Sequence, residues 1–121
     1  MIVAAHSILY ADDPDAARAF FRDVLDMPNV DAHGGWLIFK LPPAELGVHP
    51  AGDASPGGHH ELFLLCDDID RTVAELTARG AAFSGPVTDT RFGRLIRMLV
   101  PGAGEIVLYQ ASHATAYDMD A

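Results

Sequence analysis

An internal repeat is the feature that most constrains how this chain folds. His6 precedes Asp13 by seven residues, and His60 precedes Asp67 by the same interval. Further matches follow in the same order, GWLI at 35–38 with GRLI at 93–96 and PAEL at 43–46 with AGEI at 103–106. A repeat this short cannot bury one face of its sheet by itself. The two copies are therefore expected to pack together in one domain.

Each copy is expected to follow the order strand, helix, strand, strand, strand. Asp13 and Pro14 are typical of a helix start, and apolar residues then recur at helical spacing. The first copy predicts strands at 3–10, 36–41 and 45–49. The second copy predicts strands at 60–66, 94–100 and 105–110, an extended segment from Phe83, and a helix capped by Asp67 and Asp68 and ended by Gly80.

Paired in this way, the copies predict an α+β fold. Two βαβββ modules would form one curled mixed sheet, with the helices on the convex face and a groove on the other. We place module 1 at about residues 1–50, a Gly- and Pro-rich linker at 51–58, module 2 at about 59–113 and a tail at 114–121. All of them belong to a single domain, residues 1–121.

The charge balance excludes some partners. Eight Lys and Arg against 17 Asp and Glu give a net charge of -9. This argues against nucleic acid and anionic membrane surfaces, and it is compatible with a cationic small molecule. No apolar run approaches the ~18 residues of a membrane span. The single cysteine, Cys66, excludes an intrachain disulfide, so we expect a soluble, cytoplasmic protein.

The repeat resembles the vicinal oxygen chelate superfamily, which includes glyoxalases, bleomycin-resistance proteins and extradiol dioxygenases. The residues that carry the resemblance are His6, DPDAARAFF at 13–21, HELFLLCDDI at 60–69 and PGAGEIVLYQ at 101–110. The resemblance implies a homodimer with cavities built from both subunits, and a divalent metal in many members. His6 and His60 match two of the metal-ligand positions. The third is normally Glu, and here it is Val107.

Val107 offers no donor atom to a metal ion. Two neutral imidazoles hold a divalent ion weakly without a third ligand. Glu105 shares the strand face of residue 107, but it lies about 6–7 Å along the strand. The first module offers Glu45 at the position of Glu105 and His49 at the position of Tyr109. His6 and His60 therefore remain candidates for metal ligands, acid–base groups, polar ligand contacts or structural residues.

A groove lined by alternate strand residues would be largely apolar with a few polar groups, as small-molecule sites are. We predict catalytic roles for His6, His60 and Glu105, and metal binding by His6 and His60. The predicted ligand contacts are Tyr10, Glu45, His49, Leu62, Leu64, Arg94, Val107 and Tyr109. Arg91, Arg94 and Arg97 fall within seven residues, so one of them could clamp a carboxylate or phosphate, or all could be solvated.

Two functions follow from these residues. The first is an enzyme such as a metal-dependent lyase, isomerase or dioxygenase-like protein, moving a proton or adding a group next to a carbonyl. The second is a metal-free protein that sequesters a small molecule or antibiotic without catalysis. Val107 and the net charge of -9 favour the second. Cys66, before a helix start, could be an activated nucleophile or a buried, inert thiol.

Overall fold

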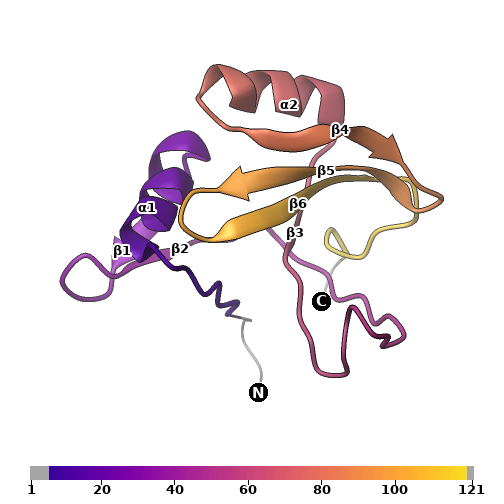
Figure 1. Cartoon of the computed structure of the whole chain (residues 1–121), viewed down its shortest axis with the longest axis horizontal. Coiled ribbons are helices and arrows are strands. Elements are labelled where there is room, and N and C mark those ends of the chain that lie inside the picture. Colours follow the sequence, from indigo (N-terminus) through magenta and orange to yellow (C-terminus); the bar gives the residue numbers. More distant parts are fainter. Residues whose placement is uncertain (1–5, 120–121) are drawn as a thin grey trace.

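The computed structural model describes residues 6–119 and contains helices and two β-sheets, which confirms the α+β class (Figure 1). In chain order the elements are α1 (Pro14–Ala19), the π-helical turn η1 (Phe20–Val24), β1 (Asn29–Asp31), β2 (Leu37–Phe39), β3 (Phe63–Leu65), α2 (Ile69–Ala78), β4 (Phe83–Asp89), β5 (Gly93–Val100) and β6 (Gly104–Ala111). None of the helices in the described range is long and apolar enough to cross a membrane.

The second half of the chain builds a complete βαβββ unit. Its strands form an open mixed sheet in the order β3-β6-β5-β4, in which β3 is parallel to β6 and the other pairs are antiparallel. The Asp68 side chain caps α2 by accepting the N–H of Arg71 at 3.1 Å. Gly80 follows the helix with a φ of +99°, which favours glycine. Strands β5 and β6 lie within one residue of the predicted 94–100 and 105–110.

The first half keeps its predicted helix. The Asp13 side chain accepts the N–H of Ala16 at 3.1 Å, and Pro14 occupies the first turn. The glycine turn at 34–35 joins two short strands, β1 and β2, which pair with each other in a separate sheet. The sequence did not indicate β1, because Asn29 and Asp31 are poor strand formers.

Two strands predicted in the first half are absent from the described residues. Residues 6–10 form no strand, although a strand was expected at 3–10, and residues 3–5 of that prediction lie outside the described range. Residues 45–49 also form no strand. Within residues 6–119 neither segment has a neighbouring strand, and a lone strand cannot satisfy its backbone groups in a ladder. Module 1 is therefore less regular than module 2.

The core lies between the helices and one face of the four-stranded sheet. Figure 1 shows α2 along one side of this sheet, while loops and the C-terminal tail flank the other. One buried cluster joins α2 to the sheet through Ile69, Ile96 and Leu108. A second cluster joins α1 and η1 to the sheet and consists of Ala17, Phe20, Ala81, Met98, Val100 and Ile106. The Asp13 N–H also donates to the Gly102 carbonyl at 3.0 Å, which ties the start of α1 to the β5–β6 turn.

Candidate functional site

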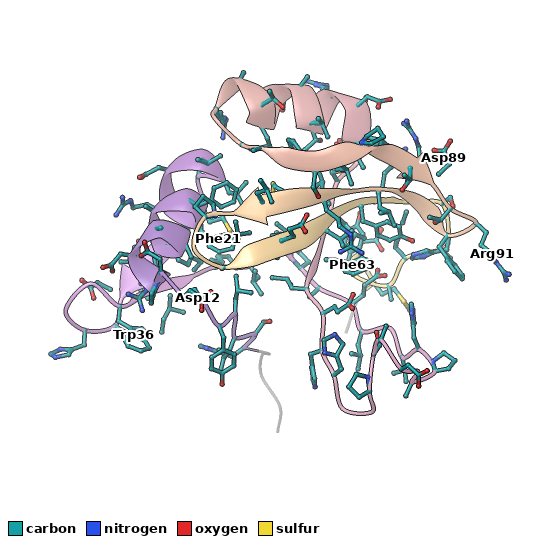
Figure 2. The ribbon with its side chains drawn as sticks, in the orientation of Figure 1. Asp12, Phe21, Trp36, Phe63, Asp89 and Arg91 are labelled. Atoms are coloured by element: carbon teal, nitrogen blue, oxygen red, sulfur yellow. The ribbon has the colours of Figure 1, made fainter. Side chains whose placement is uncertain are left out.

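Register assigns each side chain of the four-stranded sheet to one of two faces. Leu64, Ile96 and Leu108 pack under α2. Their chain neighbours point to the opposite side, which we call the open face, because side chains alternate along a strand. The open face carries Phe63 and Leu65 from β3, Glu105, Val107 and Tyr109 from β6, Leu95, Arg97 and Leu99 from β5, and Ser84 and Thr88 from β4. Figure 2 shows Phe63 on this side of the sheet, away from α2.

Tyr109 is the most enclosed polar residue of the open face. Its hydroxyl donates to the Phe92 carbonyl at 2.7 Å, and its ring meets the Phe63 ring edge-on at 5.7 Å between centroids. The His113 ring lies 5.8 Å away. Burial, and then the negative charge of Glu45, raises the pKa of Tyr109. The phenol therefore stays protonated at neutral pH and acts as a hydrogen-bond donor.

Glu45 anchors the C-terminal tail near Tyr109. Its Oε1 accepts the N–H of Ala116 at 2.9 Å and the N–H of Tyr117 at 3.3 Å. The loop that was predicted as a strand is thereby fastened to residues 112–119. The sequence predicted a groove role for Glu45, and the structure shows its Oε1 accepting two backbone hydrogen bonds from the tail, with its charge acting on Tyr109.

Replacing Glu45 with alanine is expected to loosen the tail, because two backbone N–H groups lose their acceptor. A lost hydrogen bond of about 1 kcal/mol corresponds to roughly fivefold easier local opening. Chymotrypsin cleavage after Tyr117, followed by mass spectrometry, measures this opening. Glu45→Gln keeps an acceptor oxygen and is the matched control, with cleavage near the wild-type rate. Equal cleavage of both variants and the wild type would show that Glu45 does not hold the tail.

Glu105, Arg97 and Val107 lie together on the open face. The Ser84 hydroxyl donates to Glu105 Oε2, so this carboxylate has a hydrogen-bond partner. Arg97 pairs across strands with Ser84 on one side and with Val107 on the other. Val107 is buried, which fits an apolar contact and offers no metal ligand.

The predicted histidines lie outside the strands of the sheet. His6, His49 and His60 are exposed and lie outside the strands, as does Tyr10. Their catalytic, metal or ligand roles stay predictions. The strand expected at 60–66 is only β3, so His60 and half-buried Leu62 precede it.

Leu64, predicted as a ligand contact, lies on the opposite face of the sheet from Val107. Leu64 pairs with Leu108 and packs under α2, and the open face instead receives Phe63 and Leu65. Residues 62–65 read LFLL and are apolar on both faces, so alternation could not select one. Phe63 and Leu65 are therefore the β3 residues of the open face, and the sequence analysis did not name them as candidates.

The three clustered arginines have different surroundings. Arg94 donates to Asp89 at 3.0 Å and, through two nitrogens, to Asp70 at 2.9 and 3.3 Å. The hydrogen bond from Arg94 lowers the pKa of Asp70. Arg91 stacks on Phe92 at 5.2 Å and points away from the sheet at the β4–β5 turn (Figure 2). Arg94, predicted as a ligand contact, therefore ties α2 to β4.

Cys66 has the surroundings of an inert thiol. It is half-buried, and its Sγ donates to the Tyr109 carbonyl at 3.6 Å. Burial raises the pKa of the thiol, which lowers the fraction of nucleophilic thiolate at neutral pH. The structure thus favours the structural interpretation of Cys66 over the nucleophilic one.

A βαβββ unit with a helix on one face of its mixed sheet is the module expected from the sequence repeat. The chain belongs to the Glyoxalase/Bleomycin resistance protein/Dioxygenase superfamily, whose family model matches residues 3–104. No curated protein sequence matches the chain.

Solved structures share this fold over most of their length. TnmS3, an antibiotic binding protein from Streptomyces sp. CB03234, is 27% identical with a TM-score of 0.60, covering 93% of this chain and 100% of its own. A glyoxalase/bleomycin resistance protein from the same Streptomyces is 28% identical with a TM-score of 0.55, covering 84% and 95%. Lactoylglutathione lyase from Agrobacterium tumefaciens is 22% identical with a TM-score of 0.62, covering 89% and 92%, and shows the fold alone.

Members of this superfamily commonly bind divalent metals. Among residues 6–119 of a single chain, no three His, Cys, Asp or Glu side chains are grouped to hold one. Val107 supplies no lone pair, Glu105 is bonded to Ser84, and the two matching histidines are exposed outside the sheet. The donors of one chain, as far as residues 6–119 show them, therefore do not fit a metal centre.

Proposed function

We propose that this chain binds an organic small molecule with an apolar, aromatic body against the open face, and releases it chemically unchanged. One observation carries the proposal: the open face presents Phe63 and Leu65 partly exposed beside the enclosed Tyr109 ring, and Leu99 partly exposed farther along β5. Apolar walls with a few fixed polar groups are the usual composition of a small-molecule site. The likeness to an antibiotic binding protein supports an antibiotic as the ligand class.

Binding without catalysis is supported by the state of the polar groups. Glu105 accepts a hydrogen bond from the Ser84 hydroxyl, and Glu45 accepts one from the backbone of the tail. The Tyr109 hydroxyl donates a hydrogen bond to the Phe92 carbonyl. A general base must reach the proton that it removes, and groups already engaged are poorly placed for this. The polar groups around the open face therefore serve to orient a ligand.

We propose that a second copy of the chain completes the cavity. Among the described residues, the depression at β4 and β5 measures about 160 Å³, and another of about 320 Å³ is lined by residues 25–28 and 40–42, which do not belong to the four-stranded sheet. Drug-sized ligands occupy pockets of ~300–1,000 Å³ and are mostly enclosed. Module 1 exposes large apolar side chains, with Ile8, Tyr10, Leu46 and Val48 between 65% and 88% accessible. An apolar surface of this kind is expected to be covered by a partner, here another copy.

Ligand-induced stabilisation tests the binding function. A ligand at 100 times its Kd adds about 2.7 kcal/mol, which corresponds to a rise in Tm of roughly 10 °C for a domain of this size. We expect such a rise with at least one member of a panel of aromatic and cationic antibiotics that includes bleomycin. Phe63→Ala is expected to reduce the shift, and Phe92→Ala, a change at the β4–β5 turn, serves as the matched control.

Three results would overturn the proposal. The first is a panel in which no compound changes Tm at high excess. The second is recovery of a transformed ligand by mass spectrometry, which would identify an enzyme. The third is tight binding of nickel, zinc or manganese that is lost in His6→Ala and His60→Ala. Sedimentation velocity on the same samples tests the dimer, which is expected in solution.

A further inference from the structure

We propose that Arg97 and the depression beside it form a subsite for an acidic group, a carboxylate, on the bound ligand. This inference rests on the proposed function and adds a chemical requirement to it. The sequence offers three arginines for such a role, and the tertiary structure separates them. Arg94 is held by Asp70 and Asp89, and Arg91 stacks on Phe92 at the turn.

Arg97 alone of the three lies on the open face. Its neighbours across the strands are Ser84 and Val107, and no ion pair of Arg97 occurs among the described residues. A guanidinium presents several N–H donors in a planar fork that matches the two oxygens of a carboxylate. The charge of Arg97 is therefore available to a ligand that lies against the sheet.

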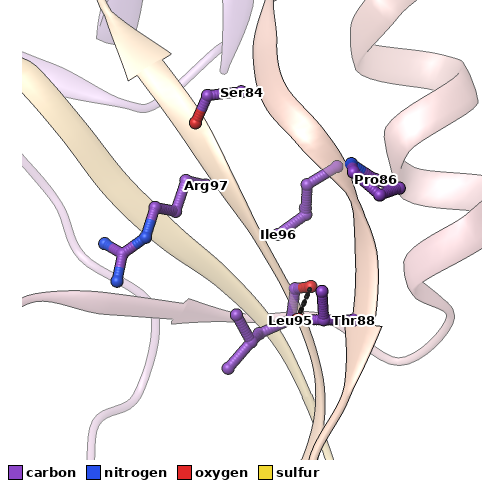
Figure 3. A pocket seen from close by; sticks show the side chains of 6 residues that line it. All are labelled: Ser84, Pro86, Thr88, Leu95, Ile96 and Arg97. Atoms are coloured by element: carbon purple, nitrogen blue, oxygen red, sulfur yellow. Dashed lines mark hydrogen bonds between the residues drawn. The ribbon is translucent and has the colours of Figure 1, made fainter.

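A depression borders Arg97 because β4 is irregular there. The register between β4 and β5 shifts between Ser84 and Thr88. Gly85, with a φ of +82°, and Pro86 lie inside that shift, so the strand bends away from its partner. The resulting hollow of about 160 Å³ is lined by Ser84, Pro86, Thr88, Leu95, Ile96 and Arg97 (Figure 3).

The surrounding groups determine where a carboxylate fits. Glu105, bonded to Ser84, repels an anion at one end of the hollow. At the other end Thr88 Oγ1 makes only a long hydrogen bond of 3.5 Å to the Leu95 carbonyl, so its hydroxyl can turn to a ligand. The carboxylate is therefore placed between Arg97 and Thr88, with the apolar body of the ligand extending toward β6 and β3.

The net charge of -9 does not prevent a carboxylate from binding beside Arg97. Exposed charges farther than about 8 Å apart are largely screened at physiological ionic strength, whereas a guanidinium in contact with a carboxylate is not. The local arginine thus outweighs the distant acidic residues. The same argument predicts that the distant charges affect the rate of encounter more than the bound state.

Two fluorescent probes with the same aromatic body test the subsite. Pyrenebutyrate carries a carboxylate, and pyrenebutanol carries a hydroxyl in its place. We expect wild-type protein to bind the carboxylate about fivefold to tenfold more tightly, the range for a partly exposed charged hydrogen bond. Arg97→Gln should remove this preference while leaving the affinity for the alcohol unchanged, and Arg97→Lys should keep part of it.

Arg91→Gln is the matched control, because it removes the same charge from an exposed residue away from the open face. Its preference for the carboxylate should equal that of the wild type. Equal binding of both probes by the wild type would overturn the subsite and leave the proposed function standing. If Arg97→Gln and Arg91→Gln lose the preference for the carboxylate equally, the subsite is also overturned. The preference would then come from the net charge of the protein and not from the position of Arg97. Failure of both probes to bind would contradict the subsite and the proposed function together.

Discussion

Met98→Ala is expected to lower the free energy of unfolding by about 2–5 kcal/mol, the range for removing a fully buried Met side chain. Met98 is 0% exposed and packs between the sheet and the first-half helix with Phe20 and Ile106. The cavity left by alanine would lie where the two halves of the chain meet. Since small domains have only about 5–15 kcal/mol of stability, the loss is large. Urea unfolding followed by far-UV circular dichroism measures it.

Leu99→Ala is the matched control for Met98→Ala. Leu99 is the next residue of β5, points to the open face and is 39% exposed. Its truncation removes less buried surface, so a loss under about 1 kcal/mol is expected. Both variants are measured at one protein concentration, because stability depends on concentration if the chain associates. Similar losses for both variants would mean that the core does not lie on the α2 side of the sheet.

Gly93→Ala is expected to cost about 2–5 kcal/mol, combining backbone strain with steric overlap. Gly93 has a φ of +156°, a conformation that side chains rarely adopt. A Cβ there would meet the Gln110 carbonyl oxygen and lie 2.8 Å from Tyr109 Cε2. The Tyr109 ring would have to move, so pyrenebutanol binding to the open face should weaken as well. Thermal unfolding and the probe titration together measure the two effects.

Gly104→Ala is the control that separates the cost of backbone strain from the cost of steric overlap at Gly93. Gly104 also has a positive φ, +83°, but nothing lies within 4 Å of a Cβ at that position. Only the backbone cost of about 1–2 kcal/mol is expected there, with probe binding unchanged. If Gly93→Ala proves no more costly than Gly104→Ala, the close approach of Gly93 to Tyr109 is not important for stability.

The second half of the chain was predictable in detail because its information is local. Asp68 caps α2, Gly80 ends it, and the turn at 101–103 separates two strands whose bounds agree with the predicted ones within one residue. In the first half the same kind of evidence located the helix after Asp13. The same local evidence failed at 45–49. That segment has a strand-like sequence pattern, but among the described residues no neighbouring strand pairs with it.

The candidate site was less predictable. The matching histidines drew attention to His6 and His60, which are exposed, while Phe63 and Leu65 went unrecognised inside an apolar run. Tyr109 and Val107 were expected in the groove and do lie on the open face. A match between repeat positions indicates common topology, but it does not fix which residues line the face on which a ligand lies.

The sequence by itself determined the superfamily, the α+β class and the order of elements after residue 60, because caps, turns and periodicity act over a few residues. Only the tertiary structure decided which face of β3 is open and which arginine can meet a ligand. Both depend on partners distant in the chain: Leu108 fixes the face of Leu64, and Asp70 engages Arg94 from 24 residues away. Such pairings arise when the chain packs, so local patterns do not contain them.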